Sequence, residues 1–323
     1  MSALATVLES TTIPTTIAMV RTGSVCNASA REAVSPPTFT TMKRSALLVV
    51  FAALAACHKA PTPSHTLFWA AEKDGKTTYL LGTMHVGVDA RTQLPQMVWK
   101  QLDKAPVFAM ETDPNDPALQ TLAEARKASL HDELGDAYWQ KLEAELTPAE
   151  AARLDHLKPV IAAVTLSLKN LPQTEAMDGA LASVARTEKK PIVFLEPMAK
   201  QIAILEKWLD ARAIKAALDH PDEAVAHDRD MLAAYLDGDE PKMAALADGE
   251  RATAKAAGYT DAEYDQEMTD LVYERNASWI DAIDKLHAQD GAFIAVGALH
   301  LIGPRSVLDL LAHRGYTVHR VEP

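Results

Sequence analysis

Two apolar segments that each end in the motif Gly-x-x-His constrain this chain more than any other feature. The first covers residues 79–85 (YLLGTMH) and the second covers residues 292–300 (AFIAVGALH). An apolar run without polar alternation is typical of a strand buried on both faces of a parallel sheet. Ligands of such sheets bind beyond the carboxyl ends of the strands. We therefore expect His85 and His300 to meet at that edge and to mark the active centre.

Two further apolar segments end in a glutamate. Residues 106–110 (PVFAM) precede Glu111, and residues 191–195 (PIVFL) precede Glu196. If all these strands are parallel, the four polar side chains emerge at one edge of the sheet. Two imidazoles and two carboxylates suit Mn, Co, Fe or Zn, and the spacing does not choose among these metals.

Each of these residues also has a simpler interpretation when it is taken alone. His85 could be a loop histidine with satisfied hydrogen bonds, and Glu111 could cap the segment that follows it. The carboxylate of Glu196 could simply interact with the positive N-terminal end of the helix that starts near Pro197. The same chemistry at the same end of four buried strands favours a shared site over four separate explanations.

The remaining pattern predicts an α/β fold with a central, mostly parallel sheet. Asp-Gly at 74–75 lies between the apolar runs 66–70 and 77–81, which predicts a leading β-hairpin. A helix over 94–105 followed by the strand 106–110 completes a βαβ unit. A final helix at about 304–313 and a strand over 316–321 close the chain.

Residues 117–289 form a large helical insertion, which only the strand 191–195 interrupts. Capping boxes at Thr147 and Thr260, each with Glu three residues later, mark the starts of two of its helices. The helices around 201–258 either cap the edge of the sheet or pack on its flank.

The first 65 residues have a different composition. Residues 1–41 show no helical or strand period, and we interpret them as a disordered leader or as sequence before the real start at Met42. Residues 42–56 have the basic start and the short apolar run of a secretory signal. They end in Leu-Ala-Ala before Cys57, which resembles the bacterial lipobox and predicts a lipidated cysteine. The alternative is an ordinary cleaved signal. Residues 57–65 read as a tether, and residues 66–323 form the folded domain.

Charge and cysteine content narrow the possible partners. Cys26 and Cys57 are the only cysteines, so the folded domain has no thiol for a disulfide or a metal site. The formal net charge is −12 at pH 7, and the first 56 residues are net basic, so the domain itself is strongly acidic. This balance argues against nucleic acid as a partner and leaves the lipid anchor as the attachment to a membrane.

Other candidate residues carry less specific signals. Asp178 lies where a helix begins, and we interpret it as an N-cap. Arg275 lies on the helix that starts near 261, where it either faces the sheet edge and stabilises an oxyanion or covers an apolar face in solvent. Four histidines in polar helical contexts read as surface residues: His220, His227, His287 and His313.

These motifs together resemble the TraB/GumN family, to which the Tiki membrane metalloproteases are related. The resemblance covers residues 67–321. Its most specific elements are LGTMHVG at 81–87, Met-Glu at 110–111, Glu-Arg-Asn at 274–276 with Trp279, and VGALHLIG at 296–303. The resemblance implies a divalent-metal site on the two Gly-x-x-His motifs and a glutamate, and in the Tiki branch the hydrolysis of peptide bonds.

The leading hypothesis is a metal-dependent hydrolase, metallopeptidase-like, on the periplasmic face of the bacterial outer membrane. His85 and His300 would bind the metal, with Glu111 as third ligand or general base. Glu196 would be the second carboxylate and Arg275 the oxyanion donor, acting on a peptide or another small substrate. Two rival hypotheses are a lipoprotein that binds haem or a metal without catalysis and an envelope scaffold protein.

Overall fold

The computed structural model describes residues 65–322. The predicted leader 1–41, the signal segment 42–56 and the tether up to residue 64, including Cys57, lie outside the described residues. Within residues 65–322, no helix is both long and apolar enough to cross a membrane.

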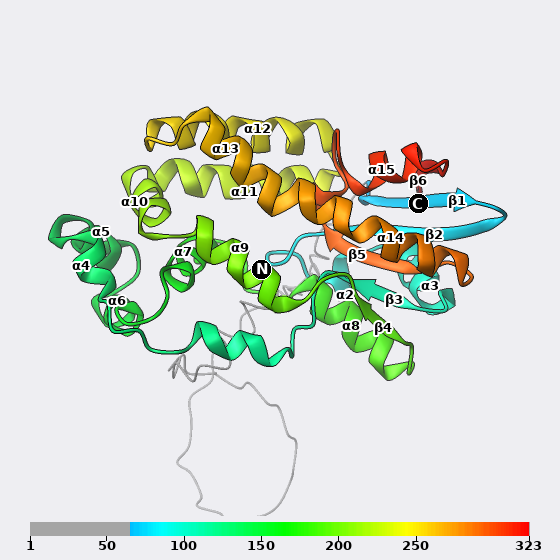
Figure 1. Cartoon of the computed structure of the whole chain (residues 1–323), viewed down its shortest axis with the longest axis horizontal. Coiled ribbons are helices and arrows are strands. Elements are labelled where there is room, and N and C mark those ends of the chain that lie inside the picture. The colour runs from blue at the N-terminus through cyan, green and yellow to red at the C-terminus, as the bar shows by residue number, and fades with distance from the viewer. Residues whose placement is uncertain (1–64, 323) are drawn as a thin grey trace, which may run out of the picture. The chain divides into compact units, whose positions relative to one another are not determined.

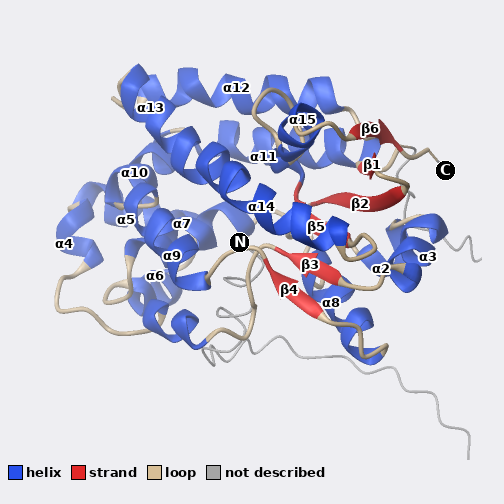
Figure 2. Ribbon diagram, turned by 45° about the vertical axis from the view of Figure 1, so that its right-hand side comes forward, coloured by secondary structure: helices blue, strands red, loops and turns tan. Residues whose placement is uncertain are grey.

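The described chain is built on a six-stranded sheet with the order β4-β3-β5-β2-β1-β6 (Figures 1 and 2). The neighbouring strands β4, β3, β5 and β2 run parallel, and β1 is antiparallel to both β2 and β6. The predicted mostly parallel sheet is therefore confirmed. The strands are β1 (Phe68–Lys73), β2 (Lys76–Thr83), β3 (Phe108–Met110), β4 (Ile192–Phe194), β5 (Phe293–Gly297) and β6 (Thr317–Arg320).

The predicted hairpin joins β1 to β2. Lys73 pairs with Lys76 at its end, and the two turn residues Asp74 and Gly75 have φ angles of 51° and 73°. Two positive φ angles in a two-residue loop are the type I′ geometry, which matches the twist of the strands and which Asp-Gly adopts readily. The local sequence Asp-Gly therefore specifies the turn that joins the first two strands of the sheet.

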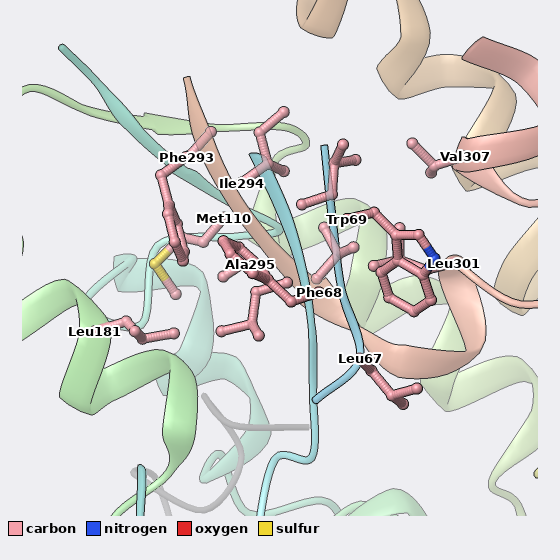
Figure 3. Close-up of a cluster of buried hydrophobic side chains, with 14 of the residues drawn as sticks. Leu67, Phe68, Trp69, Met110, Leu181, Phe293, Ile294, Ala295, Leu301 and Val307 are labelled. Carbon is pink, nitrogen blue, oxygen red and sulfur yellow. The ribbon is translucent and has the colours of Figure 1, made fainter. Parts of the chain in front are cut away.

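Apolar side chains from the central strands form the core of the sheet. Phe68, Phe108 and Phe293 are fully buried, and the ring centroid of Phe293 lies 5.7 Å from that of Phe68 and 6.2 Å from that of Phe108. Helices cover both faces: Figure 3 shows Leu181 on one side of the strands and Val307 on the other. Burial on both faces explains why the strands lack polar alternation.

Helices α2 and α3 connect β2 to β3, and the predicted helical insertion follows β3. The helices are α2 (Ala90–Gln93), α3 (Gln96–Lys104), η1 (Pro117–Leu122), α4 (Leu130–Leu134), α5 (Asp136–Glu145), α6 (Pro148–Leu154), α7 (Pro159–Leu168), α8 (Met177–Thr187), α9 (Met198–Trp208), α10 (Ala211–Asp219), α11 (Pro221–Asp237), α12 (Glu240–Ala256), α13 (Asp261–Met268), the π-helical turn η2 (Thr269–Tyr273), α14 (Glu274–Ala288), η3 (Ala298–His300) and α15 (Val307–His313).

Part of the insertion has an apolar core of its own. Helices α4 to α7 and α10 gather to the left of the sheet in Figure 1. Their buried side chains include Leu130, Leu142 and Ile214. The predicted capping box is complete at Thr260, and at Thr147 the half in which the threonine side chain accepts from the backbone N–H of Glu150 is present. Local capping and a separate core together explain how so long an insertion remains ordered.

Helix α11 lies over the carboxyl end of β2. The hydroxyl of Tyr235 donates to the carbonyl of Gly82 at 2.8 Å, and Tyr235 is 2% exposed. The helices around 201–258 were expected either to cap the edge of the sheet or to pack on its flank. For α11, this contact supports a cap over the edge.

Candidate functional site

The four polar residues predicted from the strand ends lie at one edge of the sheet. His85 and Glu111 follow β2 and β3, and Glu196 follows β4. His300 follows β5 and ends the short helix η3. Their strands are parallel neighbours, so the four carboxyl ends share that edge.

Three of these side chains converge on Gly297, the last residue of β5. Its backbone N–H donates to Glu111 Oε1 at 2.8 Å. A Cβ placed on Gly297 would lie 3.3 Å from His85 Nε2, 3.4 Å from Glu111 Oε1 and 3.5 Å from His300 Cδ2. His300 Nε2 lies 3.8 Å from Glu111 Oε1. The glycine of the second motif therefore leaves space that the two imidazoles and the carboxylate share.

The imidazole of His85 is oriented by Asp178 on α8. Its Nδ1 lies 2.7 Å from Asp178 Oδ2, and the other carboxylate oxygen accepts from the hydroxyl of Thr83 at 2.9 Å. An ionised carboxylate only accepts hydrogen bonds, so Nδ1 of His85 carries the proton. In the neutral imidazole the lone pair is then on Nε2, which faces the space beside Gly297.

His300 is held in the same tautomer by Asn276. Its Nδ1 lies 2.7 Å from Asn276 Oδ1, while the amide nitrogen of Asn276 donates to the carbonyl of Arg305. Burial lowers the pKa of His300 to about 3, and the nearby positive charge of Arg275 contributes. His300 is therefore neutral near pH 7, with its lone pair on Nε2.

Arg275 connects the site residues. Its Nη2 donates to Glu111 Oε2 at 2.5 Å, its Nε donates to Glu196 Oε1 at 2.7 Å, and its Nη1 lies 3.2 Å from His300 Nε2. Nη1 also donates to the carbonyl of Leu271 in the π-helical turn η2. Arg275 is 5% exposed, so the interpretation of it as a solvated arginine is wrong.

The charges around Arg275 keep Glu111 ionised. Burial acts to raise the pKa of Glu111, but the positive charge of Arg275 and the hydrogen bond from the Gly297 N–H hold that pKa well below its usual value. Gln201 adds a further hydrogen bond to Glu111 Oε2 at 3.1 Å. Glu111 is thus a buried, hydrogen-bonded carboxylate and does not act as a helix cap.

Glu196 binds Arg275 through one carboxylate oxygen only. The other oxygen has no hydrogen bond in the described part of the chain. Glu196 Oε2 is buried without a hydrogen bond, and Lys200 Nζ lies 3.4 Å from it. The helix α9 that follows takes Pro197 as its N-cap residue. The carboxylate of Glu196 therefore neutralises the buried guanidinium.

Three functional candidates were missed by reasoning from the sequence. Asp178 is not the N-cap of α8, whose N-cap residue is Ala176, and its carboxylate is used by His85 and Thr83. Asn276 and Gln201 also reach the centre, from α14 and α9. Asn276 had a signal, since it adjoins Arg275 in the Glu-Arg-Asn motif.

The histidines expected at the surface divide into three groups. His220 and His313 are exposed. His227 is half-buried and lies 2.9 Å from Glu250. His287 is buried, and the surface assignment was wrong for it, because its two nitrogens lie 2.9 Å from Thr78 Oγ1 and 3.0 Å from the carbonyl of Lys73.

A model of the TraB/PrgY/gumN family matches residues 67–320. The chain belongs to this family. The match includes both Gly-x-x-His motifs, Glu111, Glu196 and Arg275, so the whole candidate site lies within the TraB/PrgY/gumN region. No curated protein and no solved structure matches the chain.

The donors of this TraB/PrgY/gumN site fit a divalent cation in kind. His300 offers a neutral Nε2, His85 turns its Nε2 toward the same space while its Nδ1 meets Asp178, and Glu111 offers an anionic oxygen. Within residues 65–322, however, no group of three or more His, Cys, Asp or Glu side chains is arranged to hold a metal ion. In this arrangement Arg275 binds His300 Nε2 and Glu111 Oε2.

Proposed function

We propose that this chain is a divalent-metal-dependent hydrolase whose metal ligands are His85, His300 and Glu111. The observation that carries the proposal is the convergence of His85 Nε2, Glu111 Oε1 and His300 Cδ2 within 3.5 Å of one point beside Gly297. Two nitrogen donors and one carboxylate, with an open position, are the usual protein ligands of a catalytic metal. Mn, Co, Fe and Zn all accept this set.

The protein's own groups support this role. Asp178 and Asn276 accept the Nδ1 protons of the two histidines and so direct both lone pairs toward the shared space. Glu111 has a pKa well below its usual value. A carboxylate that stays ionised suits a metal ligand, whereas a general base needs a pKa nearer the working pH. When bound, the ion supplies Lewis acidity.

Arg275 is the group placed to stabilise negative charge that develops on a substrate oxygen. Its guanidinium is held by Glu196, by Glu111 and by the carbonyl of Leu271, and its Nη1 also lies beside His300 Nε2. A preorganised cation in a water-excluded site is worth more than one in solvent. We propose a peptide bond as the substrate, on the family's relationship to the Tiki metalloproteases.

A second candidate function is hydrolysis in which His85 acts as a general base without a metal. The specific observation that favours it is that Arg275 already binds His300 Nε2 and Glu111 Oε2. In this mechanism His85 Nε2 takes a proton from water, the hydroxide adds to the substrate carbonyl, and the proton is returned to the leaving group. Asp178 stabilises the imidazolium that forms.

The first test is metal content. Protein purified without chelators is compared with His85→Ala, His300→Ala and the control His313→Ala, whose histidine is exposed. Elemental analysis should find about one metal ion per chain in the parent and in the control, and less than a tenth of that in the two site variants. Stoichiometric metal in both site variants would falsify the ligand assignment.

Asp178→Asn separates the two candidates. For a metal site, loss of the carboxylate that orients His85 should weaken metal affinity about 10- to 100-fold. For the general-base mechanism, hydrolysis should persist in chelator in the parent, and Asp178→Asn should lower kcat about 10²- to 10⁴-fold. Retained metal with no cleavage of a peptide library would favour the non-catalytic binding protein.

We further propose that Cys57 carries a lipid anchor that places the domain on the periplasmic face of the outer membrane. The support is the Leu-Ala-Ala-Cys sequence after a short apolar run with a basic start. The acidic domain itself would be repelled by anionic lipid, so attachment would rest on the acyl chains.

A further inference from the structure

A cavity of about 590 Å³ lies in the helical insertion, among α7, α10, α11, α12 and α13. Pockets for small organic ligands have volumes of roughly 300–1,000 Å³, so this space is large enough for one. None of the side chains proposed for the hydrolytic centre lines it, although Leu271, whose carbonyl accepts from Arg275, does. The cavity is therefore a feature that the proposed hydrolase function does not use.

Small apolar side chains form much of its wall. Ala213, Ala216 and Ala217 of α10 face the cavity, as do Ala245 and Ala254 of α12. Alanine offers apolar surface with little volume, so the space between these helices stays open. Such a wall suits the hydrocarbon part of a ligand.

Carboxylates supply the charge of the cavity. Asp228 of α11, Glu250 of α12 and Glu267 of α13 all line it, and Glu250 pairs with His227 at 2.9 Å. Neither Asp228 nor Glu267 has a hydrogen-bond or ion-pair partner among residues 65–322. Lys169 is the one lysine or arginine in the described lining, and it is paired with Glu145. Two histidines also line the cavity, and both are paired: His227, whose pKa Glu250 raises, and His220, which lies 3.5 Å from Glu223.

The two unpaired carboxylates interact unfavourably with their surroundings. Burial raises the pKa of Asp228 to about 6 against the opposing charge of His227, and burial raises that of Glu267 to about 7; the charge of Glu250 adds to both shifts. A positive group in the cavity would remove this cost, whereas an anion would increase it. The charge of the cavity thus selects for a cation.

We propose that the cavity binds an organic cation with an apolar body. The ammonium group would lie against Asp228 and Glu267, and the hydrocarbon would lie against the alanines of α10 and α12. The same arrangement disfavours a fatty acid or any other anion of equal size.

The test is isothermal titration calorimetry of the purified protein with octylammonium at pH 8, where both carboxylates are ionised. Octanoate, with a similar alkyl chain and the opposite charge, is the matched ligand control. We expect saturable one-to-one binding of octylammonium and no measurable binding of octanoate. Equal binding of the two ligands, or no saturable binding of octylammonium, would overturn the proposal.

Two kinds of variant locate the binding. The double variant Asp228→Asn, Glu267→Gln should weaken octylammonium at least tenfold, and Asp222→Asn, an exposed residue of α11 outside the lining, should not. Gly249→Leu should block the cavity, because a Cβ on Gly249 meets no atom within 4 Å. Ala252→Leu on the same helix is its control.

These variants also separate this proposal from the proposed hydrolase function. His300→Ala should bind octylammonium as tightly as the parent does, since His300 is not part of the cavity. Unchanged binding in Gly249→Leu would show that octylammonium occupies another place and would reject the site.

Discussion

Nη1 of Arg275 lies 3.2 Å from Nε2 of His300, and both side chains are buried. Since guanidinium only donates hydrogen bonds, Nε2 of His300 is the acceptor and carries no proton. The same guanidinium binds Glu111 and Glu196. One buried cation thus fixes the protonation state of a histidine and of a carboxylate at the same edge of the sheet.

Arg275→Met should destabilise the fold by about 3–5 kcal/mol, because it leaves Glu111 and Glu196 buried without their cation. Urea unfolding at pH 7 measures the change. The exposed Arg229→Met is the control and should stay within about 0.5 kcal/mol of the parent. Adding Glu111→Gln and Glu196→Gln to Arg275→Met should restore part of the loss. A cost below about 1 kcal/mol for Arg275→Met would contradict this account.

The sequence predicts the strands of the site because their signal is local. The apolar runs before His85, Glu111, Glu196 and His300 indicate buried strands, and parallel pairing then places their carboxyl ends together. The strand order could not be predicted in the same way. β5 lies between β3 and β2 although it is far from both in the sequence, and no local pattern specifies such a neighbour.

Side-chain partners depend on the same long-range pairing. Asp178 begins a helix, so a cap was the simplest interpretation, and its contact with His85 joins residues 93 positions apart. His287 has a polar sequence context, yet the hairpin supplies Lys73 and Thr78 as partners for its two nitrogens. For Arg275 the spacing allowed two environments, and only burial among two carboxylates distinguishes them.

Glu267→Gln should stabilise the protein at high pH and not at low pH. Burial raises the folded-state pKa of Glu267 to about 7 from its ordinary value of 4.5. The folded state therefore binds this proton more tightly, so its contribution to stability is full below pH 4.5 and is lost as pH rises through 7. At pH 8 we expect a gain of about 1–2 kcal/mol, allowing for solvent screening, and no gain below pH 4.5. Urea unfolding across this range checks it, with the exposed Glu124→Gln as control. A gain independent of pH would argue against titration of Glu267.

Cys57→Ser should abolish acylation of the protein expressed with its full sequence. In the parent, intact mass should correspond to a chain that begins at Cys57 and carries acyl groups. Detergent should be needed to extract the parent, whereas Cys57→Ser should either retain its signal segment or leave the membrane. Cys26→Ser is the control, since Cys26 precedes the predicted start. A parent chain that begins at Met1 without modification would reject the anchor.

Gly297→Ala tests the space in which the proposed ligands meet. The new Cβ would lie 3.3 Å from His85 Nε2, tighter than nine in ten Cβ contacts, so that imidazole must give by a few tenths of an ångström, and it would lie 3.4 Å from Glu111 Oε1. We expect a stability loss of about 1–3 kcal/mol and a loss of metal retention beyond what that instability explains. Gly249→Ala is the matched control: its Cβ meets no atom within 4 Å and it lies in α12, so it should stabilise the protein by about 0.5–1 kcal/mol. Metal retention in Gly297→Ala equal to that of Gly249→Ala would show that the convergence at Gly297 is not the metal site.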